Sequence, residues 1–169
     1  MNWYRNDKEI KEPINEYLSK LFDEEMDKGY FLKVAVGTDS AKCGMKTYQF
    51  ATVIMITTCE DLGGGVIVGR GAMVIHRKSK QSFYKTKAEN VNERMLVEVT
   101  KSIEAAYELS DVMDQYGFKM SIHADINPDP KEGSNSAMNQ AVGYILGMGY
   151  DFEVKPNSLA AMSSADKLC

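Results

Sequence analysis

Three apolar, extended segments follow one another along this chain, and they constrain its fold more than any other feature. Each is rich in β-branched or aromatic side chains, and a short polar or glycine-rich turn separates it from the next. The three segments span residues 31–39, 47–59 and 65–76. Gly69 and Gly71 inside the third segment indicate a β-bulge. Since strands joined by short turns pair antiparallel, the sequence predicts a three-stranded antiparallel meander.

The rest of the chain alternates between helix and strand. Thr86 and Glu89 have the spacing of a capping box and predict the start of a long helix. Its apolar stripe comprises Val91, Met95, Val99, Ile103 and Ala106. Beyond it we expect a strand at 119–126, a helix at 136–149, a strand at 151–156 and a short helix at 158–169. Strands that helices separate favour parallel pairing, so we predict an α/β fold with a mixed five-stranded sheet in the order β-β-β-α-β-α-β-α, flanked by helices.

An amphipathic helix precedes this pattern. Pro13 stands where a first helical turn begins, and Gly29 closes the segment. Apolar residues recur between them at helical spacing, at Ile14, Tyr17, Leu18, Leu21 and Phe22. We therefore expect an N-terminal helical extension at 1–29 and one main domain at 30–169.

Composition limits the class of protein. The formal net charge of -4 argues mildly against a protein that coats nucleic acid, but it leaves room for an enzyme built on carboxylates. The three cysteines, Cys43, Cys59 and Cys169, are odd in number and far apart, which fits a reducing cytosol. No stretch resembles a signal sequence or a membrane span, so we expect a cytoplasmic protein.

Two aspartates end expected strands. Asp39 follows the apolar run V-A-V-G-T, and Asp125 closes S-I-H-A-D. If these strands are parallel neighbours, both carboxylates lie at carboxyl ends, where open α/β sheets place their sites. The alternative is that each residue only caps a turn.

Two further acids complete a possible cluster. Glu98 borders the apolar stripe of the long helix and either turns inward or stays in solvent, with Glu93 and Glu89 as alternatives one or more turns earlier. Asp166 lies among small residues of the last helix. Clustered carboxylates repel one another, and divalent cations that prefer oxygen ligands relieve that repulsion. The sequence thus predicts a site for Mg²⁺ or Mn²⁺.

At this point the chain resembles the ribonuclease H-like superfamily. That fold carries its acids on the first strand, the first core helix, the fourth strand and the last helix, which here correspond to Asp39, Glu98, Asp125 and Asp166. The segments G-T-D-S, H-A-D-I-N, G-Y-I-L-G-M-G and K-P-N-S-L-A-A-M-S-S-A-D resemble more closely the YkuK-type family, which is related to RuvC-type resolvases.

The resemblance implies a nuclease that hydrolyses phosphodiester bonds with two metal ions. Asp39 would bridge the ions, Asp125 and Glu98 would complete the shell of one, and Asp166 that of the other. It also implies a nucleic-acid partner, which is RNA, DNA, a hybrid or a junction, and a possible homodimer.

Several other residues could serve such a site. His123 lies on the same strand face as Asp125 and is a ligand, a partner of a ligand, a proton shuttle or a buried structural residue. The chain has no acid between Asp61 and Glu89. The candidates there for contacting nucleic acid are Arg77, Lys78, Lys80 and Lys85, with Lys155 near the last strand and with the rings of Phe83 and Tyr84 interleaved. The alternative is a solvated, charged surface.

Two rival functions use the same fold. One is a catalytically inert nucleic-acid-binding or assembly module. The other is an actin-like nucleotide-binding protein, which normally needs two such domains. Binding of Mn²⁺ and stabilisation by ATP would separate these three classes.

Overall fold

The structure is a computed structural model that describes residues 2–84, 87–125, 135–154, 157–158 and 160–168. Its strands are β1 (Tyr4–Arg5), β2 (Lys8–Glu9), β3 (Phe31–Lys42), β4 (Thr47–Asp61), β5 (Ile67–Ser82), β6 (Met120–His123) and β7 (Asp151–Glu153). Its helices are α1 (Ile14–Asp27), α2 (Lys87–Glu108), α3 (Ser110–Tyr116) and α4 (Asn135–Gly147). A π-helical turn, η1 (Ala160–Ala165), and a 3₁₀ turn, η2 (Asp166–Leu168), follow; we call them together the C-terminal segment.

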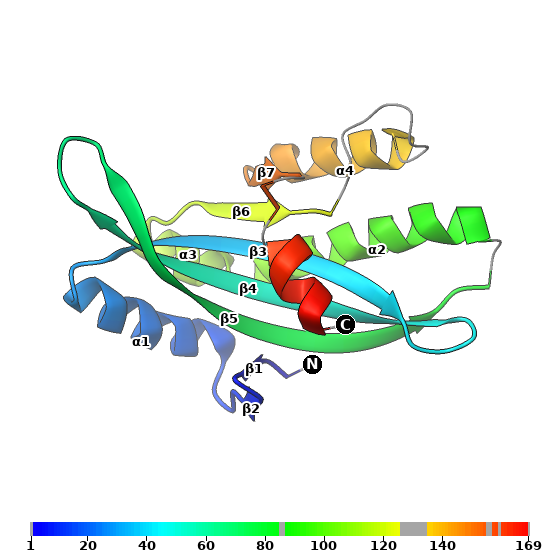
Figure 1. Cartoon of the computed structure of the whole chain (residues 1–169), viewed down its shortest axis with the longest axis horizontal. Helices are drawn as coiled ribbons and strands as arrows, with labels where there is room; N and C mark the ends of the chain where they lie inside the picture. Colours follow the sequence, from blue (N-terminus) through cyan, green and yellow to red (C-terminus); the bar gives the residue numbers. More distant parts are fainter. Residues whose placement is uncertain (1, 85–86, 126–134, 155–156, 159, 169) are drawn as a thin grey trace.

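Within the described residues, the strands form one mixed sheet in the order β2-β1-β5-β4-β3-β6-β7 (Figure 1). The meander of β3, β4 and β5 is antiparallel, and β6 and β7 join it in parallel, as the sequence predicts. The bulge is also confirmed. Thr58 pairs with Gly71 and Cys59 with Gly69, so Arg70 is the extra residue.

The strands of the meander are longer than their apolar runs. β3 continues past Asp39 to Lys42, so the prediction that Asp39 ends this strand is wrong. β5 likewise continues to Ser82, which pairs with Thr47 of β4. The reason is that an antiparallel hairpin tolerates polar residues where one face is exposed to water. The backbone hydrogen bonds between the strands therefore extend beyond the apolar residues.

In the part of the chain that the structure describes, the sheet has seven strands where five were predicted, because a small hairpin lies at its edge. Tyr4 pairs with Glu9 inside the hairpin and with His76 of β5 outside it. Asn6 and Asp7 have φ angles of 49° and 61°. Two consecutive positive φ angles make the type I′ turn that joins two-residue hairpin loops, and Asn and Asp tolerate them. Strands of two residues are too short to produce a periodic sequence pattern.

The two faces of the sheet carry different layers. On one face, which we call the α2 face, Val34 and Val36 of β3 belong to a core shared with α1, α2 and α3. On the other, the C-terminal face, Ala35 packs with Ala160 and Ala165 of the C-terminal segment. Figure 1 shows this segment crossing in front of β3 and β4. Strand alternation therefore decides which side chains meet which layer.

The long helix predicted after the meander is divided. α2 ends at Glu108, and α3 begins at Ser110 and is closed by Gly117, whose φ of 64° is left-handed. None of the helices in the described ranges combines the length and apolarity needed to cross a bilayer.

Candidate functional site

The parallel pairing of β3 and β6 ends two residues before two of the predicted site residues. The ladder runs from Val34 opposite Met120 to Gly37 opposite His123. β6 ends at His123, two residues before Asp125, so the prediction that Asp125 ends this strand is wrong, although the charges of Asp39 and Asp125 interact. Asp39 shares the alternation of Ala35, so it belongs to the C-terminal face. Pairing with β6 stops before Asp39, which leaves this part of β3 next to β4 alone.

The carboxyl group of Asp39 is half-buried, and its surroundings are acidic. Burial raises its pKa above the ordinary value, and the charges of Asp125 and Asp166 raise it further. The backbone N–H of Ser40, which donates a hydrogen bond to it, and the charge of Arg94 oppose this shift. Three predicted carboxylates from three elements thus interact electrostatically.

Glu98 lies on the other side of β3. It is buried, and Ser40 Oγ donates a hydrogen bond of 2.5 Å to its Oε1. Burial raises the pKa of Glu98 to about 7; the Ser40 hydrogen bond lowers it and the charge of Asp39 raises it. Of the alternatives, Glu93 is half-buried, and the side chain of Glu89 lies outside the described residues. Glu98 therefore contacts β3 through Ser40.

A buried polar network continues from Glu98 along α2. Ser102 Oγ lies 2.9 Å from Thr38 Oγ1, which donates to Thr52 Oγ1 at 3.0 Å. Arg94, four residues before Glu98, approaches its carboxylate at 3.6 Å. The sequence reasoning missed Ser40 and Arg94. Strand alternation after Asp39 and the i,i+4 spacing before Glu98 are the signals that could have found them.

The C-terminal segment carries Asp166 and is attached by His123. The backbone N–H of Ala160 donates to His123 Nδ1 at 3.1 Å, and Nε2 lies 3.0 Å from Ser121 Oγ. Because Nδ1 accepts, the neutral ring carries its proton on Nε2 and donates it to Ser121. Burial lowers the pKa of His123, which favours this neutral form. Gln49 Nε2 donates to the carbonyl of Leu168 at 3.3 Å and secures the end of the segment.

The acidic residues are coupled, but they do not form a closed cage. Among the described residues, no three His, Cys, Asp or Glu side chains lie close enough together to hold a metal ion. Strand alternation is one reason, because it directs Asp39 and Ser40, the partner of Glu98, to opposite faces of β3. Asp166 itself is exposed at the start of η2.

The predicted basic residues separate into two groups. Lys78 and Lys80 alternate with Val74 and belong to the C-terminal face. The ladder aligns Lys78 with Ala51 and Ala51 with Asp39, so the lysine lies two strands, or about 10 Å, from the aspartate. The residues Lys85 and Lys155 lie outside the described residues.

Arg77 belongs instead to the α2 face, where its surroundings are structural. Its Nη1 lies 2.6 Å from Glu108 Oε2, and its guanidinium stacks 4.4 Å from the ring centroid of Trp3. These contacts tie β5 to α2 and to the N-terminal hairpin. The sequence placed Arg77 in one run with Lys78, but adjacent positions on a strand face opposite sides.

Comparison with known proteins gives one positive result. A family model described as Ribonuclease H-like matches residues 12–169, which is nearly the whole chain and includes α1. A search of curated proteins and a search of solved structures each returned no match.

Proposed function

Because the chain belongs to the ribonuclease H-like family, we propose that it is a nuclease that hydrolyses phosphodiester bonds with the help of Mg²⁺ or Mn²⁺. The observation that supports the proposal is that the ladder of β3 and β6 ends two residues before Asp39 and Asp125, whose charges interact. Neither residue is near the other in sequence, so only this fold unites them.

The donor chemistry suits a hard divalent cation. Magnesium keeps several waters and needs only one or two protein carboxylates beside the phosphates of a substrate. A pair formed by Asp39 and Asp125, with the charge of Asp166 nearby, meets that requirement without a third side chain in contact. The raised pKa of Asp39 also fits, since a bound cation would offset the mutual repulsion of these acids.

Each residue then has a distinct task. Asp39 and Asp125 would hold the cation, Asp166 would supply charge from the C-terminal segment, and Glu98 would add charge from α2. When bound, the metal ions would lower the pKa of a water molecule and stabilise the leaving oxygen. Ser40 orients the Glu98 carboxylate. His123 acts on the site by fixing the backbone of Ala160, and through it the position of the segment that bears Asp166.

Lys78 and Lys80 are the described cations best placed to contact a phosphate backbone. They lie on the same face as Asp39, and Lys78 is in the same cross-strand row. A phosphate next to the scissile one could therefore meet a lysine while the scissile group lies at the aspartates. This local positive charge also offsets the overall acidity of the chain.

The test is a panel of labelled single-stranded, duplex, hybrid and branched substrates incubated with Mg²⁺ or Mn²⁺. We expect Asp39→Asn and Asp125→Asn to reduce cleavage by about 100-fold or more, since each removes a charge that holds the metal. Asp151→Asn is the matched control, because Asp151 is exposed at the amino end of β7. Equal cleavage by all four proteins would indicate a contaminating nuclease and end the proposal.

One observation favours a second candidate, a nucleic-acid-binding module without catalysis. The hydrogen bond from Ser40 and the raised pKa of Glu98 suit a protonated, structural glutamate as well as a metal ligand. Calorimetry with Mn²⁺ separates the two functions. Binding that disappears in Asp39→Asn supports the nuclease, whereas oligonucleotide binding without any metal binding supports the module.

A further inference from the structure

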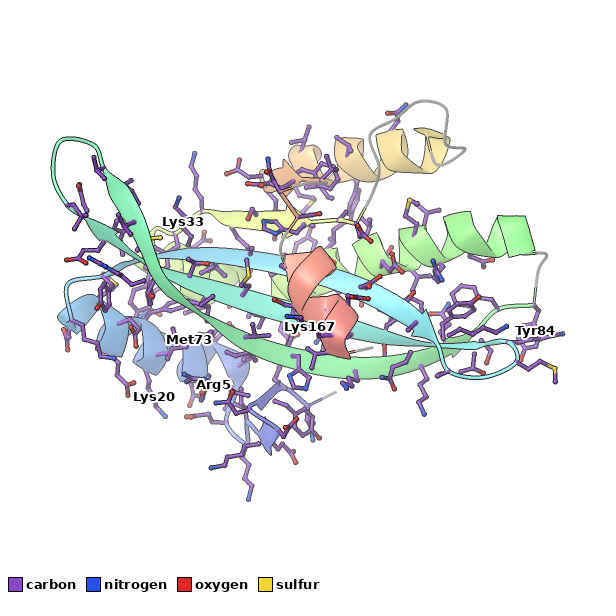
Figure 2. All side chains as sticks on the ribbon, in the orientation of Figure 1. Arg5, Lys20, Lys33, Met73, Tyr84 and Lys167 are labelled. Atoms are coloured by element: carbon purple, nitrogen blue, oxygen red, sulfur yellow. The ribbon has the colours of Figure 1, made fainter. Side chains whose placement is uncertain are left out.

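The turn between β3 and β4 presents large, exposed side chains at one end of the sheet. Met45 is 90% exposed and Tyr84, which follows β5 beside this turn, is 78% exposed. Figure 2 shows Tyr84 at the extreme end of the molecule, next to the β3–β4 turn. We call Met45, Lys46 and Tyr84 the tip. Single exposed apolar side chains are normal on a protein surface, so the neighbours of these residues decide whether they form a contact site.

The tip stands on a rigid base. Phe83 is buried, and its backbone N–H donates to the carbonyl of Lys46 at 2.8 Å. Its ring packs edge-on against Tyr48, with 5.5 Å between the centroids, and lies 6.1 Å from the ring of Phe50. Tyr84 comes directly after this anchor. Its ring is exposed to solvent, and its attachment to a packed neighbour reduces the ordering that a stacked ligand would require.

Positive charges accompany the rings. Lys46 Nζ lies 5.3 Å from the ring centroid of Tyr84, and the guanidinium of Arg94 lies 5.1 Å from that of Tyr48. Neither residues 40–50 nor residues 62–88 contain an Asp or a Glu. Arg94 also approaches Glu98, but the β3–β4 turn and the segment that carries Tyr84 contain no acid, which suits a ligand that combines flat bases with phosphates.

The tip lies along β3 from Asp39. Tyr48 pairs with Lys42, three residues along β3 from Asp39, which corresponds to about 10 Å. A strand bound at the aspartates can thus reach the tip within a few nucleotides.

We propose that Tyr84, supported by Met45 and Lys46, stacks on an unpaired base and so makes single-stranded nucleic acid the preferred ligand of this protein; the inference rests on the proposed function. A base inside a duplex has both faces covered by its neighbours, whereas an unpaired base offers a free face to an exposed ring. Since every base has such a face, the tip selects for strandedness and not for sequence.

The experiment measures binding instead of cleavage. A labelled oligonucleotide, single-stranded or annealed to its complement, is titrated with protein in the Asp39→Asn background, and fluorescence anisotropy is recorded. We expect Tyr84→Ala to weaken single-strand binding about tenfold and to leave duplex binding unchanged. Tyr84→Phe, the matched control, keeps the ring and should bind like the parent. The exposure of Tyr84 makes a folding defect unexpected, and a thermal melt verifies this.

A second variant reports stacking directly. In Tyr84→Trp the new indole should be quenched when the single strand is added, beyond any change from the buried Trp3, which both proteins share. Single-strand affinity that is equal in Tyr84→Ala and its parent overturns the inference, and so does an equal loss for single strand and duplex.

Failure of the two proposals can be distinguished. If the wild type cleaves in the presence of metal but Tyr84→Ala does not change binding, only the proposed role of the tip is contradicted. If binding depends on Tyr84 but no cleavage occurs, only the proposed nuclease activity is contradicted. A wild type that binds neither form of nucleic acid overturns both.

Discussion

The two faces of the central sheet differ in the layers that cover them. The α2 face is covered by helices, and its core contains bulky side chains such as Phe22 of α1 and Ile54 and Ile56 of β4. The C-terminal face is covered by one short segment over small residues, and it bears Asp39 with Lys78. A thick layer buries apolar area, whereas a thin one leaves open sheet on which charged side chains can meet a ligand.

The largest effect should come from the thick layer. Phe22→Ala removes a fully buried ring from α1 and should lower the free energy of unfolding by about 3–5 kcal/mol. Urea denaturation measures the change. Met26→Ala on the same helix, at a position that is 44% exposed, should change it by less than about 0.5 kcal/mol. Similar losses for both variants would contradict this account of the α2 face.

Glu98 lies on that face but is titratable, so its contribution should depend on pH. Its pKa is raised from 4.5 to about 7, and therefore folding is favoured below pH 4.5 and loses this contribution as pH rises through 7. We expect the metal-free wild type to lose about 3 kcal/mol relative to Glu98→Gln between pH 4.5 and pH 8.

The measurement for Glu98 is denaturant unfolding of both proteins across this pH range. Burial lowers the pKa of His76 and of His123, which acts in the opposite direction, but both residues are present in both proteins and cancel in the difference. Parallel pH profiles for the two proteins would show that Glu98 is not desolvated.

Overpacking the thin layer should give a smaller effect. Ala165→Leu places a large side chain between the C-terminal segment and the sheet and should cost about 1–3 kcal/mol. Hydrogen exchange should show the loss concentrated in residues 160–168. Ala72→Leu, at an exposed position of β5, is the control and should leave exchange in that segment unchanged.

The smallest effect separates neighbouring residues on opposite faces. Arg77→Gln should lower the free energy of unfolding by about 1 kcal/mol, because it breaks the contacts with Glu108 and Trp3. Lys78→Gln should leave the free energy of unfolding unchanged. It should instead reduce the slope of log affinity for an oligonucleotide against log salt concentration by about one. The reverse assignment of these effects would show that the α2 face binds the nucleic acid.

The sequence by itself determined the elements that have a period. Apolar alternation and helical spacing predicted the antiparallel meander, the helices and the two parallel strands, and paired glycines predicted the bulge opposite Thr58 and Cys59. It also placed Asp39 on the first strand of the meander, although β3 does not end there. These features were predictable because the periodicity of apolar residues follows local backbone geometry. The length of each connection then indicates whether two strands pair antiparallel or parallel.

Only the tertiary structure decided which side chains meet. Two contacts join residues on different elements: Ser40 donates a hydrogen bond to Glu98, and the backbone of Ala160 donates one to His123. The structure also separates two neighbours on one strand, since Arg77 contacts Glu108 on the α2 face and Lys78 lies on the opposite face. Such contacts depend on strand register and helix rotation, and a shift of one residue in either reverses the face of a side chain. A linear sequence contains no direct record of those two quantities.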